Sequence, residues 1–186
     1  MWQLCHDRIA LLSCEAPGRS VSNPRMSDPT RVEPKLSPGI RRLLHLYWRF
    51  SRGMTLGVRA AAIDAGGRVF LVRHTYVPGW HLPGGGVEPG ETALEALARE
   101  LREEACIEWS GEAQLLGVYQ NLIASDRDHV LLYVIREFRI TEAKTRDREI
   151  AEAGFFSPDA LPDGVTAGTR ARLDEIFRGH APALVW

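Results

Sequence analysis

GGGVEPGETALEALARELREEACIEW, residues 84–109, is the stretch that decides the fold. Its three leading glycines precede a segment in which apolar residues recur every three or four positions, the spacing of an amphipathic helix. Thr92 and Glu95 have the spacing of a capping box, so this helix is predicted to begin just after Thr92. The apolar stripe expected to pack on a sheet consists of Leu94, Leu97, Ala98, Leu101 and Ala105.

A second stripe on the same helix is acidic. Glu100, Glu103 and Glu104 fall within an arc of roughly 100°, beside the apolar stripe and at the edge of the expected core. Like charges at this spacing destabilise a helix by a few tenths of a kcal/mol, so something should offset them. One interpretation is a solvated face in which Arg99 pairs with Glu95 and Glu103. The other is a hard divalent cation bound by carboxylate oxygens.

The spacing of residues around the helix decides between these interpretations. Gly85 is followed after five residues by Glu91, and after seven more by the run Arg99-Glu100-Leu101-x-Glu103-Glu104. This order resembles the Nudix box, Gly-x5-Glu-x7-Arg-Glu-U-x-Glu-Glu-x-Gly-U, in which U is a bulky aliphatic residue. The preceding GWHLPGGGVEPGE, residues 79–91, also resembles the lead-in common in that family.

One position departs from the family pattern, because Cys106 occupies the place of the last glycine. A helix would end there in a left-handed residue, and a side chain at such a position costs about 1 kcal/mol. We interpret Cys106 as a structural variant with a small buried thiol. The change affects the turn and leaves the acidic residues intact.

The resemblance implies an α/β protein with the Nudix fold, an α/β/α sandwich with a mixed β-sheet. It implies a hydrolase that cleaves a nucleoside diphosphate linked to another moiety by attack of water on phosphorus, with Mg²⁺ or Mn²⁺ as cofactor. The residues that match the family's metal ligands are Glu100, Glu103, Glu104 and the carbonyl of Gly85. Glu91 and Arg99 match a supporting ion pair between loop and helix. The general base is either Glu100 or a later loop glutamate, for which Glu149 and Glu152 are the candidates.

Substrate contacts are less well defined by the sequence. Arg73 and His81 are candidates for phosphate, and Trp80 and Tyr119 for stacking on a base, although such aromatic residues also serve as core. A proline expected in ADP-ribose hydrolases of the family is absent from VYQNLIASD, residues 118–126. A nucleoside triphosphate and a nucleotide sugar both remain open as substrates. The rival interpretations are a non-catalytic nucleotide-binding regulatory module and a structural protein with a solvated acidic helix.

Composition restricts the partners and the compartment. The 186 residues include 23 basic and 24 acidic side chains, so no net charge would attract nucleic acid or acidic lipid. The three cysteines, Cys5, Cys14 and Cys106, form neither a metal pair nor an even disulfide framework. No apolar run is long enough to span a membrane. We expect a cytoplasmic protein that acts on a small nucleotide.

The N-terminal third divides into a tail and a helix. Residues 1–36 are predicted to be a flexible tail, and residues 1–25 are hypothesised to lie upstream of a true start at Met26. A basic amphipathic helix is predicted over residues 38–52; it would pack on its own domain or on a second copy, as in a homodimer, more often than on a membrane. The hydrolase domain is expected to occupy residues 37–186.

The rest of the chain has the order of a mixed sheet with helices on both faces. Residues 55–64 and 68–74 are predicted to form a hairpin around a Gly-rich turn. Further strands are predicted at 113–121, 129–140 and 153–156, and a final helix at 166–178.

Overall fold

A computed structural model describes residues 37, 39–40, 43, 47 and 53–186. The predicted tail 1–36 and the proposed start at Met26 lie outside the described residues. In the expected helix 38–52, the described residues Gly39, Ile40, Leu43 and Tyr47 are helical, and the others lie outside. Within the described part of the chain, no helix combines the length and the apolar character needed to cross a membrane.

The described domain has eight strands and two helices, with three strands before the first helix and five between the two helices. They are β1 (Thr55–Ala62), β2 (Val69–His74), β3 (Trp80–His81), α2 (Ala93–Ala105), β4 (Ile107–Trp109), β5 (Gln114–Gln120), β6 (Asp128–Ile135), β7 (Phe138–Ile140), β8 (Ile150–Phe156) and α3 (Ala167–Arg178). The predicted strand 129–140 is divided into β6 and β7, and β7 pairs with the short β4.

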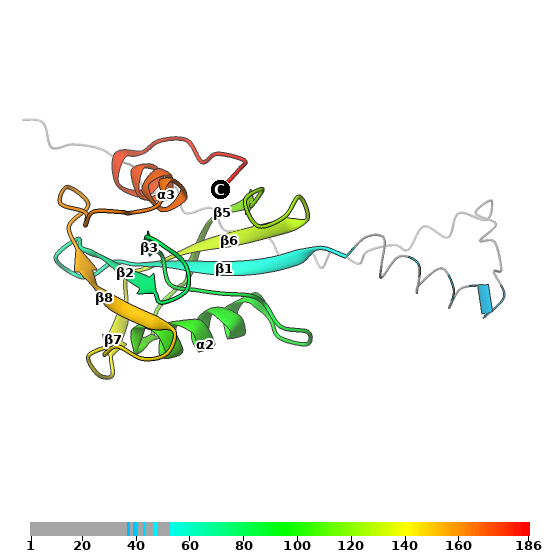
Figure 1. Cartoon of the computed structure of the whole chain (residues 1–186), viewed down its shortest axis with the longest axis horizontal. Coiled ribbons are helices and arrows are strands. Elements are labelled where there is room, and N and C mark those ends of the chain that lie inside the picture. Colours follow the sequence, from blue (N-terminus) through cyan, green and yellow to red (C-terminus); the bar gives the residue numbers. More distant parts are fainter. Residues whose placement is uncertain (1–36, 38, 41–42, 44–46, 48–52) are drawn as a thin grey trace, which may run out of the picture. The chain divides into compact units, whose positions relative to one another are not determined.

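Two three-stranded sheets make up the centre of the domain. In the first, β1 runs parallel to β6 and β6 runs antiparallel to β5; in the second, β2 lies between β3 and β8, antiparallel to both. Figure 1 shows α2 on one side of the strands and α3 on the other. The predicted α/β/α sandwich with a mixed sheet is therefore confirmed.

The alternation of side chains along β1 explains why both of its faces are covered. Val58, Ala60 and Ala62 belong to the core cluster beneath α2, whereas Ala61 and Ile63 belong to the cluster that includes Leu173 of α3. Successive residues of a strand point to opposite faces, so an uninterrupted apolar run produces two cores.

The hairpin predicted for residues 55–74 is wrong, although both of its strands exist. β1 and β2 meet only at an isolated bridge between Ile63 and Val69 and then diverge into different sheets. The other edge of β1 is occupied by the glycine loop, residues 83–87. The amide of Val58 donates to the carbonyl of Gly85 at 2.9 Å, and the amide of Ala60 donates to the carbonyl of Pro83 at 2.9 Å.

Helix α2 begins with the predicted capping box at Thr92 and Glu95. Its buried face differs from the predicted stripe, because Leu94 is 46% exposed and Ala96 has no exposed surface. Glu104 also lies on the buried face rather than at its edge. The packed stripe is thus rotated toward the acidic residues, which brings one carboxylate against the strands.

Helix α2 ends with Cys106 as its C-cap, in the left-handed conformation that the sequence predicted. Cys106 has φ 52° and is the only non-glycine residue with positive φ in the part of the chain described by the structure. Its thiol is free and buried. The strain that the sequence predicted at this position is therefore present and is tolerated.

The glycine loop can lie so close to β1 because its residues lack side chains. A Cβ atom added to Gly84 would be 2.1 Å from the carbonyl oxygen of Val58, and Gly84 has φ 139°. A Cβ atom on Gly86 would meet nothing within 4 Å.

We therefore expect Gly84→Ala to lower the free energy of unfolding by more than about 2 kcal/mol, and Gly86→Ala to change it by less than about 0.5 kcal/mol. Urea titration followed by circular dichroism measures both variants. Equal stability of the two variants would contradict the close approach of the loop to β1.

Candidate active site

Gly85 brings the loop backbone against the helix. A Cβ atom on Gly85 would lie 2.3 Å from Oε1 of Glu100, so only glycine allows this carboxylate to reach the backbone. The carbonyl of Gly85 accepts from Val58, which fixes its position along β1. The loop and the acidic face of α2 therefore form one continuous surface.

Arg99 links this loop to the helix. Its Nε and Nη2 donate to the two oxygens of Glu91 at 3.0 and 3.1 Å, and Nη2 also donates to the carbonyl of Gly86 at 3.0 Å. Nη1 donates to Glu100 at 2.6 Å and lies 3.6 Å from an oxygen of Glu103. A fork of donors with this geometry suits several carboxylates at once. Arg99 thus holds Glu91 and Glu100 in fixed positions.

Glu104 is the most buried of the three acidic residues. Its side chain accepts from the amide of Gly84 at 2.8 Å and lies 3.6 Å from Nε2 of His74. The pKa of Glu104 is raised to about 7, chiefly by burial and to a smaller extent by the charges of Glu100 and Glu149, against the opposing effects of Gly84 and Arg59. The surroundings of Glu104 therefore favour the gain of positive charge.

Arg59 of β1 supplies a cation that the sequence analysis did not identify. Its guanidinium donates to the carbonyl of Leu82 at 2.9 Å and to that of Gly84. Burial lowers the pKa of Arg59, and the nearby charges of Glu104 and Glu100 oppose this effect. The available signal was a single charged residue within the apolar run of β1, TLGVRAAA. Nη1 makes both of these bonds, and the pKa of Glu104 stays raised although Arg59 is nearby, so Arg59 only partly offsets the carboxylates.

His74 does not provide the missing positive charge. Its pKa is lowered to about 4, chiefly by burial and to a smaller extent by the cation Arg59 and the neighbouring His81. Its imidazole is therefore neutral at pH 7 and cannot form an ion pair with Glu104.

The acidic residues form a suitable donor set for a hard cation, although their oxygens do not converge. In the described part of the chain, no three His, Cys, Asp or Glu side chains have a metal-binding arrangement. Glu103 is turned toward Arg99 with 60% of its side chain exposed, and Glu104 is turned toward Gly84. All of the donors are oxygens, as Mg²⁺ and Mn²⁺ prefer, and burial together with the neighbouring carboxylates makes the negative charge of Glu104 unfavourable without a positive partner. The residues present therefore fit a divalent cation.

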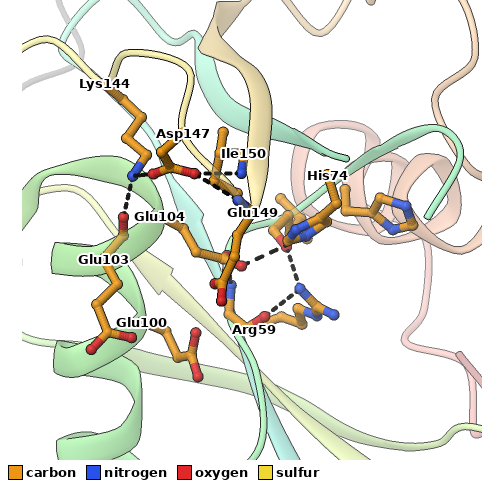
Figure 2. Close-up of polar contacts among 12 residues, drawn as sticks. Arg59, His74, Glu100, Glu103, Glu104, Lys144, Asp147, Glu149 and Ile150 are labelled. Carbon is orange, nitrogen blue, oxygen red and sulfur yellow. Dashed lines mark hydrogen bonds and ion pairs between the residues drawn. The ribbon is translucent and has the colours of Figure 1, made fainter. Parts of the chain in front are cut away.

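The two loop glutamates have different positions. Figure 2 shows Glu149 beside Glu104, in agreement with the effect of its charge on the pKa of Glu104. Glu152 lies within β8 and forms an ion pair with Arg73 of β2. Of the two residues, only Glu149 faces the acidic side of α2.

A short ion pair positions the loop that contains Glu149. Asp147 accepts from the amides of Glu149 and Ile150 at 2.8 and 2.7 Å and pairs with Lys144. The amide of Ile150 and the ammonium of Lys144 lower the pKa of Asp147 to about 2. Lys144 also donates to the carbonyl of Glu103 (Figure 2). The loop before β8 is thereby attached to the last turn of α2.

A cavity of about 560 Å³ opens beside Gly85. It is lined by residues of β1 and the glycine loop, the β5–β6 connection, the start of α3 and the last residue, including Arg59, His81, Gly85, Asn121, Ile123, Asp128, Thr166, Gly168 and Trp186. A cavity of this size is in the range of small-molecule sites. It lies next to the carboxylates without including them.

Of the four predicted substrate contacts, the structure places only His81 in this cavity. Tyr119 has no exposed surface and donates its hydroxyl to Glu175, so its ring is part of the core. Trp80 is 8% exposed, and its ring packs edge-on against Phe156. Arg73 pairs with Glu152. The sequence analysis missed Asn121, Asp128 and Trp186, because residues from separate loops carry no shared spacing that could identify them.

The chain is similar to known proteins in both sequence and fold. Residues 53–177 match the family model of the NUDIX domain. A putative 8-oxo-dGTP diphosphatase of Bacillus subtilis (strain 168) is 30% identical over 125 residues, 67% of this chain and 81% of that protein. An ADP-ribose pyrophosphatase of Methanocaldococcus jannaschii is 42% identical over 82 residues, 44% of this chain and 47% of that protein. The crystal structure of a MutT NUDIX hydrolase from Burkholderia pseudomallei has a TM-score of 0.58 and 28% identity, over 67% of this chain and 98% of that one.

The raised pKa of Glu104 gives a testable dependence of stability on pH. Its pKa is higher in the folded state than the ordinary 4.5, so the wild-type protein loses stability as the pH rises from about 4.5 to about 7, and loses no more above that. Glu104→Gln keeps an acceptor for Gly84 and removes this loss. We expect its advantage in unfolding free energy over wild type to grow by about 1–3 kcal/mol between pH 5 and pH 8.

Urea titrations in EDTA at several pH values measure this difference. Glu112→Gln, which removes an exposed carboxylate outside the helix, is the control. The expectation is contradicted if the difference in unfolding free energy between Glu104→Gln and wild type is constant across this range, because ionisation of Glu104 then does not lower stability.

Proposed function

Because the chain belongs to the NUDIX domain family and is a Nudix hydrolase, we propose that it is a metal-dependent pyrophosphohydrolase. Its substrate would be a nucleoside diphosphate linked to another moiety, as in a nucleoside triphosphate or a nucleotide sugar. Similarity to the putative 8-oxo-dGTP diphosphatase over most of that protein's length supports the first of these. The expected setting is the reducing cytoplasm, in keeping with the free thiol of Cys106.

One observation carries the proposal. The glycine loop places the backbone of Gly85 against Glu100 at the edge of a cavity large enough for a nucleotide. Buried Glu104 lies on the next turn of the same helix, in surroundings that favour added positive charge. A pyrophosphate bound in the cavity would therefore lie next to a group of carboxylates. Because both are negatively charged, cations would be needed between the pyrophosphate and the carboxylates.

Glu100, Glu103, Glu104 and the carbonyl of Gly85 are the groups that would hold Mg²⁺ or Mn²⁺. Such a cation neutralises phosphate charge and lowers the pKa of bound water. Arg99 keeps Glu100 against Gly85 through its bonds to the loop. The exposed Glu103 needs no core rearrangement to turn from Arg99 toward a ligand.

Glu149 is the residue that we propose as the general base. It faces the acidic side of α2 from a loop that Asp147 and Lys144 anchor. A base must come within hydrogen-bond distance of the attacking water, either directly or through a second water. Glu152, on β8, is instead paired with Arg73 of β2.

On the substrate side, His81 and Arg59 line the cavity next to the glycine loop. Both have donors that suit phosphate oxygens. Burial lowers the pKa of His81, and the cation Arg59 lowers it as well, against the bond to the carbonyl of Pro78. His81 would thus be neutral, and its one N–H, now donated to the carbonyl of Pro78, would have to turn away from that carbonyl to bind phosphate, whereas Arg59 would remain the charged group.

The second candidate function is a nucleotide-binding regulatory module without hydrolytic activity. Glu100, Glu103 and Glu104 are all present in this chain, and a binding module has no use for three mutually repelling charges. Hydrolysis and binding are therefore to be measured on the same preparation.

The decisive experiment is a screen for phosphate and nucleotide release. We expect turnover of at least one member of a panel containing dGTP, 8-oxo-dGTP, ADP-ribose and nucleotide sugars, with Mg²⁺ or Mn²⁺ and not with EDTA. Glu103→Gln should lower kcat/KM by about 100-fold or more, because a charged cation ligand is lost. The control Glu112→Gln removes an exposed carboxylate outside α2 and should match wild type. No turnover across the panel, with nucleotide binding retained, would support the regulatory module instead.

A second measurement separates the two loop glutamates. We expect Glu149→Gln to lower kcat by about 100-fold with little change in KM, since general-base catalysis contributes about 10²–10⁴ in rate. Glu152→Gln should leave kcat within about twofold of wild type, because its partner Arg73 lies outside the cavity. If both variants retain full activity, the base is Glu100.

A further inference from the structure

Residues 183–186 lie along the edge of β5. The amide of Gln120 donates to the carbonyl of Leu184 at 2.9 Å, and the amide of Trp186 donates to the carbonyl of Gln120 at 2.9 Å. Gln120 and Val185 form a parallel bridge. The segment is therefore an added strand-like edge in a defined register, which fixes the position of Trp186.

A buried polar network holds the same segment from the side of α3. The carboxylate of Glu175 accepts from the hydroxyl of Tyr119 at 2.8 Å, from Arg172 at 2.7 Å and from the amide of Ala183 at 2.9 Å. Arg172 also donates to the carbonyl of Val185 at 3.0 Å. Arg172 and Glu175 are 2% and 8% exposed, so loss of these bonds would leave buried charges unpaired. The network therefore allows little freedom to residues 183–186.

The indole of Trp186 is enclosed by three neighbours. Tyr119 meets it edge-on with ring centroids 5.7 Å apart, and the guanidinium of Arg172 lies 5.6 Å from its centroid. A Cβ atom on Gly168 would lie 2.5 Å from Nε1 of Trp186, so the start of α3 also lies against the ring. Trp186 nevertheless lines the cavity that opens beside Gly85.

We propose that Trp186 is a substrate-binding residue that stacks on the nucleobase of the substrate, with Tyr119, Arg172 and Glu175 as the residues that position it. This inference rests on the proposed function, in that it assigns the base to the cavity whose other wall is the glycine loop. An aromatic ring suits any flat base, because stacking does not depend on a hydrogen-bond pattern. Ile123, which is 87% exposed, adds an apolar surface at the same cavity.

The test measures binding of nucleoside monophosphates, GMP and AMP, by calorimetry in EDTA, so that neither metal nor turnover is required. Trp186→Ala should weaken binding by about fivefold or more, the lower range of base–aromatic stacking, and Trp186→Phe should restore most of it. Leu184→Ala is the matched control, because Leu184 lies in the same segment, is 84% exposed and does not line the cavity.

A second variant displaces the ring without removing it. Gly168→Ala would push the indole of Trp186, and we expect weaker binding in the wild-type background and no further loss in the Trp186→Ala background. Such non-additivity distinguishes contact through Trp186 from a general loss of structure. Near-ultraviolet circular dichroism of each variant reports whether the fold is retained.

The inference is overturned if Trp186→Ala binds both nucleotides as tightly as the wild type does, or if the wild type binds neither. It is also overturned if Leu184→Ala weakens binding as much as Trp186→Ala does. Failure of the proposed function gives a different result, namely intact nucleotide binding that depends on Trp186, without turnover of any member of the hydrolysis panel.

Discussion

The hydrogen bonds between the glycine loop and the free edge of β1 are the constraint on which the site depends. They place Gly84 and Gly85 between a central strand and α2, where no side chain would fit. With the loop in that position, the carboxylate of Glu100 lies against the backbone of Gly85, and the carboxylate of Glu104 accepts from the amide of Gly84. The hairpin that the local sequence favoured cannot form at the same time, because the loop uses the edge of β1 that β2 would need.

The same geometry gathers more negative than positive charge in a partly buried place. Arg99 and Arg59 offset part of it, and both also hold the loop backbone, so they serve to fix the structure. His74 stays neutral because of burial. An isolated folded chain therefore holds Glu104 at some cost, and a bound cation would remove that cost. Binding sites commonly contain charged groups that are unfavourable until an oppositely charged partner binds.

The cavity has a different origin from the acidic face of α2. The acidic residues come from one helix and one loop, whereas the cavity is assembled from the ends of β1, the β5–β6 connection, the start of α3 and Trp186. Tyr119, expected at the substrate, supports Trp186 from the core instead. The segment 183–186 connects β5 with α3, since it pairs with Gln120 at the end of β5 and donates to Glu175 of α3.

The sequence by itself determined the family, the approximate positions of β1, β2, β5 and β6, both helix starts and the left-handed end of α2, because each depends on residues within a few positions of one another. The resemblance to the family also implied the partnership of Glu91 and Arg99, which the structure contains as an ion pair. Only the tertiary structure decided that β1 pairs with the glycine loop, that Glu104 is buried, that Glu149 rather than Glu152 faces the helix, and that Trp186 lines the cavity. These features join segments far apart in the chain, and the register and burial that create them are set by packing, for which local periodicity contains no information.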